Sequence, residues 1–218
     1  MKFIDLSHTI EEGLITYKGL PAPIICDFWT REVSKAWFDD GTSFQIGKIE
    51  MVANTGTYID TPFHRFDQGA DLSEIALEQI CRLESILITA PYSEQLAIGR
   101  SFFEGKELRN KAVIIYTGWD MHWKTETYYS NSPFLTADAA AYLVEQKVKL
   151  VGIDSHNIDN TGEKCRPVHT QLLGNSILIV EHLCNLQSVN QNQFFFTAVP
   201  PKIKGMGTFS VRAYAELE

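Results

Sequence analysis

The chain has 218 residues, of which 44% are hydrophobic and 21% are charged. This balance is typical of a globular protein and excludes an intrinsically disordered one. Nineteen basic and twenty-seven acidic residues give a formal net charge of −8. The sequence contains no cluster of Lys and Arg of the kind that binds nucleic acid, so we expect no nucleic-acid partner. No repeat or linker divides the chain, which predicts a single domain over residues 1–218.

The cysteines and the apolar runs bear on the compartment. The four cysteines form no C-x-x-C pair, which favours reduced, mostly buried thiols in a cytoplasmic protein. Asp5 interrupts the first apolar run, so we expect no signal peptide. The strongest apolar runs, such as residues 177–180, are too short to cross a bilayer, and we expect no membrane partner. The cysteines are Cys26, Cys81, Cys165 and Cys184.

Strands and helices are predicted from apolar periodicity. Residues 72–81 and 137–146 carry apolar side chains at helical spacing, and Thr136 and Asp138 suit the start of the second helix. The strand–helix–strand order of the second half predicts parallel pairing with right-handed crossovers. The first half adds antiparallel strands, so we predict an α/β domain with a mixed central sheet. The expected strands cover residues 2–6, 44–53, 86–89, 112–117, 149–153, 177–180, 194–198 and 209–215.

The most informative stretch reads NTGTYIDTPFH and ends at His64. If it continues the preceding strand, Asn54, Tyr58 and Asp60 project from one face, because strand side chains alternate. Pro62 cannot donate to a ladder, so the strand should end there and His64 should lie on the following turn. A carboxylate and an imidazole at a strand end suit metal ligation or proton transfer. A half-buried strand whose Asp60 caps the next loop explains the pattern equally well.

A second polar stretch contains His169, and Glu181 follows twelve residues later at the C-terminal end of the strand 177–180. Open α/β sheets usually bind their ligands at this end. A glutamate in such an apolar run is rarely buried without a partner. A salt bridge between Glu181 and Arg166 is the simpler alternative, and Asp154, at the end of the preceding strand, is a further candidate for the same edge.

These stretches resemble the signature His-x-Gly-Thr-His-x-Asp-x-Pro-x-His of the cyclase-type metal-dependent hydrolases, which include bacterial kynurenine formamidases and isatin hydrolases. The resemblance implies a swivelling β/β/α fold, a divalent metal site with zinc or manganese, and hydrolysis of a small amide, formamide or cyclic amide. It also implies a homo-oligomer, a dimer or tetramer. It covers nearly the whole chain, with matching segments at residues 4–7, 54–64, 117–119, 151–155, 167–169, 179–183 and 211–213.

The resemblance also implies roles for four side chains. Asp60 corresponds to the signature aspartate, a metal ligand, and His64 to the last signature histidine, a general acid/base or ligand. His169 and Glu181 correspond to the pair that completes the metal centre in formamidase-type members. In the expected reaction a metal lowers the pKa of bound water, and His64 takes the proton of that water and returns it to the leaving nitrogen.

Two positions depart from the signature, because Asn54 and Tyr58 stand where the family has histidines. An amide oxygen is a weak zinc ligand, and a phenol ligates only with a lowered pKa. We therefore expect one metal ion rather than two, with Asn54 contacting substrate and Tyr58 donating a hydrogen bond to a developing oxyanion. The alternative is a decayed member of the family that binds a small ligand without turnover.

Other aromatic and imidazole side chains are candidates for the substrate pocket. Trp119 could wall a planar substrate or simply pack after a core strand. His156 follows a strand end and could reach the pocket. His182 should point to the side of its strand opposite Glu181 and have a structural role, and a surface or strand-capping role is expected for His8.

Overall fold

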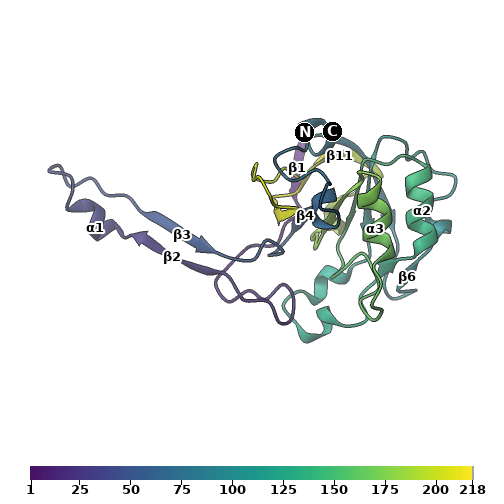
Figure 1. Cartoon of the computed structure of the whole chain (residues 1–218), viewed down its shortest axis with the longest axis horizontal. Coiled ribbons are helices and arrows are strands. Elements are labelled where there is room, and N and C mark those ends of the chain that lie inside the picture. Colours follow the sequence, from purple (N-terminus) through teal and green to yellow (C-terminus); the bar gives the residue numbers. More distant parts are fainter. Residues whose placement is uncertain (218) are drawn as a thin grey trace.

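The computed structural model describes residues 1–217, which form a body around one large curled sheet and a long arm that projects from it (Figure 1). The strand order of the large sheet is β1-β13-β11-β5-β7-β9-β10-β4-β12. Its strands are β1 (Lys2–Asp5), β4 (Tyr58–Asp60), β5 (Leu83–Thr89), β7 (Ala112–Tyr116), β9 (Leu150–Ile153), β10 (Leu178–Glu181), β11 (Gln193–Thr197), β12 (Thr208–Ser210) and β13 (Tyr214–Leu217).

The centre of the sheet is parallel and its two edges are antiparallel. Strands β5, β7, β9 and β10 pair in parallel, while β4 and β12 on one side and β11, β13 and β1 on the other pair antiparallel. Strand β7 reads Ala-Val-Ile-Ile-Tyr, and its side chains alternate between two buried apolar clusters. Such a continuous apolar run is expected for a strand covered on both faces. The predicted mixed α/β sheet is therefore confirmed.

Two helices cover one face of the parallel strands (Figure 1). Helix α2 (Ala137–Glu145) buries Ala140 and Leu143 in the same cluster as Val151 of β9. Helix α3 (Pro167–Gly174) begins with a proline, which lacks only an N–H that a first helical turn leaves unpaired in any case. Helix α3 connects β9 to the parallel strand β10. Its N-terminal turn therefore lies near the carboxyl ends of these two strands.

Short elements connect the main ones. Strands β6 (Ala97–Ile98) and β8 (Phe134–Leu135) form a separate parallel pair. The 3₁₀ turns are η1 (Pro62–His64), η2 (Leu77–Gln79), η3 (Arg100–Phe102), η4 (Trp119–His122), η5 (Glu126–Tyr129) and η6 (Leu186–Ser188). Among the described residues, no helix has both the length and the apolar character needed to cross a membrane.

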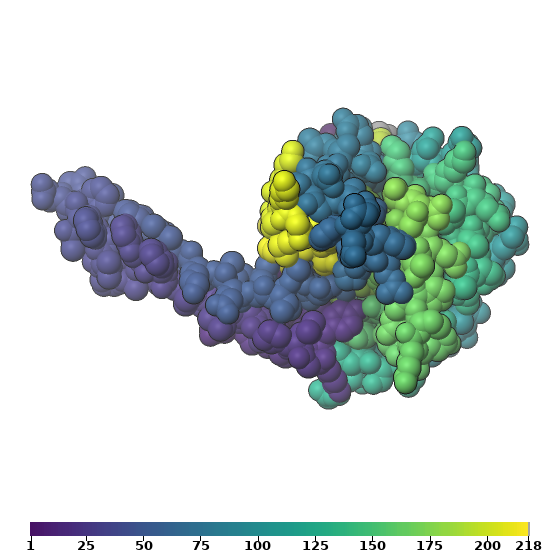
Figure 2. Space-filling model, in the orientation of Figure 1, coloured from purple at the N-terminus to yellow at the C-terminus, as the bar shows by residue number. Residues whose placement is uncertain are grey.

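The arm is an antiparallel hairpin of β2 (Ile24–Trp29) and β3 (Ile46–Glu50), with the short helix α1 (Arg31–Lys35) at its tip. It extends far from the body in the space-filling view (Figure 2). Nearly every residue of both strands is exposed. The sequence predicted a strand over residues 44–53, which corresponds to β3 but ends earlier, at Glu50. The sequence did not predict the partner strand β2.

Two predicted elements have a different structure. Residues 72–81 form turns and η2 instead of a helix, because Ala76 adopts an extended conformation and the Leu72 N–H donates to Met206 across the chain. The predicted strand 209–215 is broken into β12 and β13. The backbone between them turns aside, and Val211 N–H donates to the Thr57 carbonyl at 2.9 Å.

The cysteines also differ from expectation. All four thiols are free, as predicted, but three of them are exposed and Cys184 is half-buried. The exposed ones lie on the arm and on loops of the body, where no apolar cluster covers them. Cysteine type alone was therefore a poor guide to burial here.

Asp154 follows β9 and fixes the end of β7. Its buried carboxylate accepts hydrogen bonds from the Thr117 N–H at 2.9 Å, the Thr117 hydroxyl at 2.5 Å and the Gly118 N–H at 2.8 Å. It therefore ties the carboxyl ends of two adjacent parallel strands together, and it does not line the cavity described below.

We expect the substitution Asp154→Ala to lower the free energy of unfolding by about 2–4 kcal/mol, because three buried donors lose their acceptor. Chemical denaturation followed by circular dichroism measures this. The matched control is Asp138→Ala, at an exposed position in the first turn of α2, which should cost less than about 1 kcal/mol. Equal losses in the two variants would contradict the role of Asp154.

Candidate metal centre

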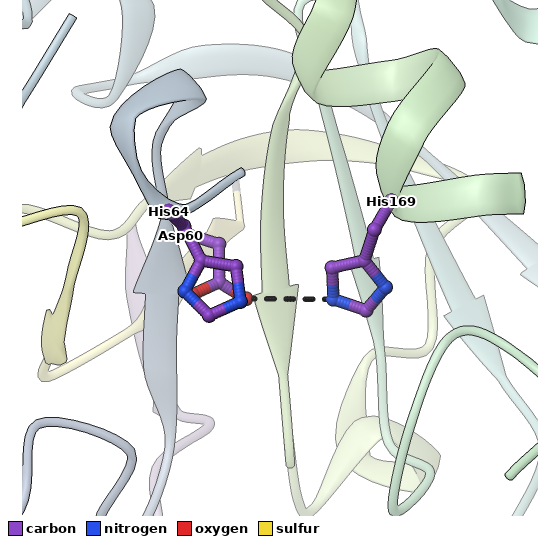
Figure 3. Close-up of side chains that lie close together, drawn as sticks. All are labelled: Asp60, His64 and His169. Carbon is purple, nitrogen blue, oxygen red and sulfur yellow. Dashed lines mark ion pairs between the residues drawn. The ribbon is translucent and has the colours of Figure 1, made fainter. Parts of the chain in front are cut away.

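Three side chains of types that can bind a metal ion, from β4, η1 and α3, lie close together (Figure 3). Asp60 is the last residue of β4, His64 lies on η1 and His169 on the first turn of α3. One ligand atom from each lies within 4.8 Å of the others. They border a cavity of about 260 Å³ that is lined by Tyr17, Leu20, Asn54, Tyr58, Asp60, His64, Asn157, Thr161, Arg166, His169 and Glu181.

Strand register places the acidic groups. In the antiparallel pairing of β4 with β10, Tyr58 lies opposite Glu181 and Asp60 opposite Ile179. Directly opposed residues and residues two apart project from the same face, so Asp60 and Glu181 share the face that α3 covers. On the other side of β4, Thr208 of β12 lies opposite Asp60. Tyr58 and Asp60 therefore share one face, as predicted, but β4 does not continue the strand that ends at Glu50, and Asn54 lies outside both strands.

His169 is oriented by Asp159, a residue that the sequence did not single out. The Nδ1 atom of His169 lies 2.6 Å from Asp159 Oδ2, and the N–H groups of Val168 and His169 donate to the same carboxylate. A carboxylate accepts but does not donate, so Nδ1 carries a proton and Nε2 is the ring atom that can bind a metal ion in place of a proton. This is the usual outer support of a metal-binding histidine. An acidic residue shortly before a helix that starts with proline was the only sequence signal for it.

His64 is oriented through Thr208. The Thr208 hydroxyl donates its single proton to Asp60 Oδ1, and it lies 2.8 Å from His64 Nδ1. Because that proton is already used, Nδ1 of His64 is the donor to the hydroxyl oxygen. Neutral His64 therefore presents an unprotonated Nε2, which suits a ligand or a general base.

Glu181 is buried at the end of β10 with both oxygens hydrogen-bonded. Oε2 accepts from the Tyr58 hydroxyl at 2.6 Å, and Oε1 accepts from the Ile158 N–H at 2.6 Å. Burial raises the pKa of Glu181 to about 7, and the charge of Asp60 acts in the same direction. Burial and the charge of Glu181 raise the pKa of Tyr58 well above its usual value, so the phenol stays protonated and remains a donor.

The donor set fits a divalent cation. Asp60 Oδ2 is buried without a hydrogen-bond partner, and it lies 3.7 Å from His169 Nε2. His169 Nε2 lies 3.7 Å from Glu181 Oε1 as well. Two ligands of a tetrahedral ion with bonds of about 2.1 Å stand roughly 3.4 Å apart, close to these separations. An unpaired buried carboxylate oxygen is costly unless a proton on the facing imidazole or a metal ion offsets its charge.

The pKa of His169 also shows that the buried carboxylates favour a positive charge at this site. Burial lowers it, but the hydrogen bond to Asp159 and the charges of Glu181 and Asp60 outweigh burial and raise the pKa to about 10. Two buried carboxylates thus stabilise a positive charge at Nε2. A metal ion satisfies the same need by replacing that proton, as metal binding to histidine generally does.

The other predicted site residues divide into two groups. Asn54 and Tyr58 line the cavity, whereas Trp119 and His156 are buried outside its lining. The alternative salt bridge to Glu181 is absent from the described structure, since Arg166 Nη1 donates to backbone carbonyls of the loop before α3.

Two further histidines, His8 and His182, lie outside the lining of the cavity. His182 is fully buried, with Nδ1 2.8 Å from the Tyr128 hydroxyl, and His8 stacks on Trp123 with ring centroids 3.9 Å apart. Burial lowers the pKa of both, to about 4 for His8, so both are neutral. The side chain missed most clearly is Tyr17, whose hydroxyl accepts from Asn157 at 2.7 Å and lies 3.3 Å from the Tyr58 hydroxyl.

The family model described as "Putative cyclase" matches residues 4–160 of this chain. The chain belongs to this cyclase family. It is 27% identical over 214 residues to the kynurenine formamidase of Bacillus anthracis, covering 97% of this chain and 96% of the relative.

Solved structures share the fold of this cyclase-family chain. Isatin hydrolase A from Ralstonia solanacearum superposes with a TM-score of 0.83 at 19% identity, covering 100% of this chain and 92% of the other. A potential metal-dependent hydrolase with cyclase activity gives a TM-score of 0.80 at 24% identity, covering 100% and 98%. The fold expected from the signature is therefore confirmed.

We expect Asp159→Asn to weaken zinc or manganese binding by about 10- to 100-fold, because His169 loses the acceptor that fixes its tautomer. Competition with a chromophoric chelator measures the affinity. The control is Glu163→Gln, which removes a nearby exposed carboxylate and should leave metal affinity unchanged. A normal affinity in the Asp159 variant would show that His169 does not bind the ion through Nε2.

Proposed function

We propose that this cyclase-family protein is a metal-dependent amidohydrolase that cleaves the C–N bond of a small amide, formamide or cyclic amide. The observation that carries the proposal is the buried Asp60 Oδ2, which has no hydrogen-bond partner and lies 3.7 Å from Nε2 of His169. Support also comes from the kynurenine formamidase relatives and from the isatin hydrolases that share the fold.

We propose that Asp60, His169 and Glu181 hold the metal. His64 can join them as a ligand only through Nε2, and only while that atom is not exchanging a proton. Their mixed nitrogen and oxygen donors suit zinc and manganese alike. A divalent ion bound there lowers the pKa of its water towards about 7 and polarises a carbonyl.

We propose that His64 is the general acid/base. Its Nδ1–H donates to Thr208, so Nε2 is free to take a proton from the attacking water and to return it to the leaving nitrogen. The side chain is partly exposed at the cavity, where a substrate can reach it. Asp60 and Thr208 keep the ring in this orientation throughout.

Tyr58 remains a candidate catalytic residue. In the structure its proton is shared with Glu181, so donating to an oxyanion would require that hydrogen bond to break. Its second contribution is to hold the Glu181 carboxylate while Ile158 holds the other oxygen. The amide of Asn54 offers both a donor and an acceptor to substrate at the cavity wall.

Trp119 and His156 remain proposed substrate contacts that would act only if the cavity widens. Trp119 Nε1 donates to the Tyr128 carbonyl, and the backbone oxygen of His156 accepts from Tyr17. Both side chains would have to move from these packed positions. We also propose a cytoplasmic location and a homo-oligomeric state, a dimer or tetramer.

Substituting His64→Ala should lower kcat/KM by about 10²–10⁴-fold, because the proton acceptor is lost. Asp60→Asn should abolish both metal binding and turnover. Hydrolysis of N-formylkynurenine, isatin and related lactams, with added zinc or manganese, measures this. Asp67→Asn, an exposed carboxylate beyond η1, is the control and should behave like the wild type.

The same assay distinguishes an enzyme from a decayed family member that only binds a ligand. The observation that favours this alternative is that Tyr58 stands at the position of a signature histidine. A binding protein would take up ligand with no turnover under any metal condition. Turnover that disappears in Asp60→Asn would exclude it. Wild-type protein loaded with metal that hydrolyses none of these amides would contradict the proposed enzyme.

We expect the wild-type chain to bind one ion, and the double variant Asn54→His, Tyr58→His to bind up to two. The two imidazoles would restore the signature donors beside Asp60 and remove the phenol from Glu181. Elemental analysis after dialysis counts the ions, and the single variant Tyr58→Phe, which adds no donor, is the control. Two ions in the wild type would overturn the single-ion proposal.

A further inference from the structure

Arg166 is a cation in the wall of the cavity that has no anionic partner in the described structure. It lies at the N-cap of α3, half-buried, beside the candidate metal centre. Among the described residues that line the cavity, it is the only one with a permanent positive charge. The arginine ion pairs of the described chain belong to Arg82, Arg100 and Arg212. The charge of Arg166 is therefore left for a ligand.

The loop before α3 fixes the guanidinium group in place. Nη1 donates to the backbone carbonyls of Asn160 at 3.2 Å, Glu163 at 2.6 Å and Cys165 at 2.9 Å. Within residues 1–217, Nε and Nη2 donate no hydrogen bond. These two nitrogens share one edge of the planar group, and such an edge matches the two oxygens of a carboxylate. Because Nη1 already holds the group, a ligand that binds this edge costs little side-chain entropy.

The same loop adds a second donor to this wall. Thr161 lines the cavity, and its hydroxyl makes no hydrogen bond to the residues that the structure describes. Asn157 is already engaged, because its amide donates to the Tyr17 hydroxyl at 2.7 Å and its oxygen accepts from the Asp159 N–H at 2.9 Å. Arg166 and Thr161 thus leave donors on this wall for a ligand.

The charges around the cavity favour an anionic ligand once a metal ion is bound. Asp60 and Glu181 supply the carboxylates of the lining. A divalent ion bound beside them would offset both charges, and the guanidinium of Arg166 then leaves the cavity positive. A cleft of one sign concentrates ligands of the opposite sign. This local charge contrasts with the chain as a whole, whose formal net charge is −8.

We propose that Arg166 binds a carboxylate group of the substrate, so that the substrates are small amides or formamides that carry a carboxylate. This inference rests on the proposed amidohydrolase function and names its substrate class. Charge-assisted, bidentate hydrogen bonds between arginine and a carboxylate are stronger than neutral ones. A neutral amide or lactam leaves the guanidinium edge unpaired in the closed cavity, and a site with unpaired polar groups discriminates against such a ligand.

Matched substrates test the proposal on the full-length, zinc-loaded protein. The ortho, meta and para formamidobenzoates carry the carboxylate, and the corresponding formamidobenzamides have the same shape without the charge. We expect the wild type to prefer at least one formamidobenzoate over its benzamide by about 10- to 100-fold in kcat/KM, mainly through KM. Arg166→Gln should remove this preference. Arg166→Lys, which keeps the charge but not the two-pronged edge, should retain part of it.

The matched control is Lys164→Gln, which removes a positive charge from the same loop at an exposed position outside the cavity lining. This variant should keep the wild-type preference. If Arg166 only holds the loop through Nη1, Arg166→Gln lowers kcat/KM equally for the charged and the neutral substrates. Such an equal loss would overturn the proposal.

Calorimetric binding separates this inference from the proposed function. If the zinc-loaded wild type hydrolyses neither series, the amidohydrolase function fails, but the affinities for each benzoate and benzamide still show whether Arg166 selects the carboxylate. We expect the benzoate affinity to fall by about 10- to 100-fold in Arg166→Gln, with zinc affinity unchanged. A carboxylate preference that persists in Arg166→Gln would assign that group to the metal ion instead. That result, or a wild type without any preference, would contradict the proposal.

Discussion

Two carboxylates, Asp60 and Glu181, are buried on one face of adjacent antiparallel strands, and the rest of the site follows from the need to offset their charge. Each donor around them reduces that cost. Thr208 takes one oxygen of Asp60, and Tyr58 and the Ile158 N–H take the oxygens of Glu181. Only Oδ2 of Asp60 stays without a hydrogen-bond partner, and it faces the imidazole of His169. A cation would bind between these two groups. The parallel centre of the sheet keeps this arrangement rigid, because its strands are packed on both faces.

Tyr58 replaces a histidine of the family's signature, and its contacts in the structure explain how the replacement is accommodated. The phenol of Tyr58 reaches the Glu181 carboxylate and turns a lost ligand into a hydrogen-bond donor. The chain of hydroxyls continues to Tyr17 and the amide of Asn157. Tyr58, Tyr17 and Asn157 thus form a network of neutral hydrogen-bonding groups at a position where the signature has a histidine. The cyclase fold tolerates the change, because the phenol satisfies one oxygen of the buried Glu181 carboxylate.

Much of the site could be predicted from local sequence, because strand alternation and the proline after β4 fix the directions of Tyr58, Asp60 and His64. The supporting residues could not. Asp159 and Thr208 reach the site only through the start of α3 and the register of β12, which the sequence does not reveal. Long-range contacts of this kind also explain why the helix predicted at 72–81 was wrong. The apolar side chains there have helical spacing, but the segment is held by contacts with distant parts of the chain, such as the hydrogen bond from Leu72 to Met206. The arm was missed, since β2 has no alternating pattern.

The two roots of the arm are also walls of the cavity: Tyr17 and Leu20 precede β2, and Asn54 follows β3. Whatever holds the arm therefore also restricts the motion of these walls. If a contact on the arm orders these walls, the energetic coupling is reciprocal, and a ligand that binds between the walls must strengthen that contact by the same factor. Contacts of the arm and ligand binding in the cavity are then linked in a single equilibrium, although the tip of the arm lies far from the site (Figure 1).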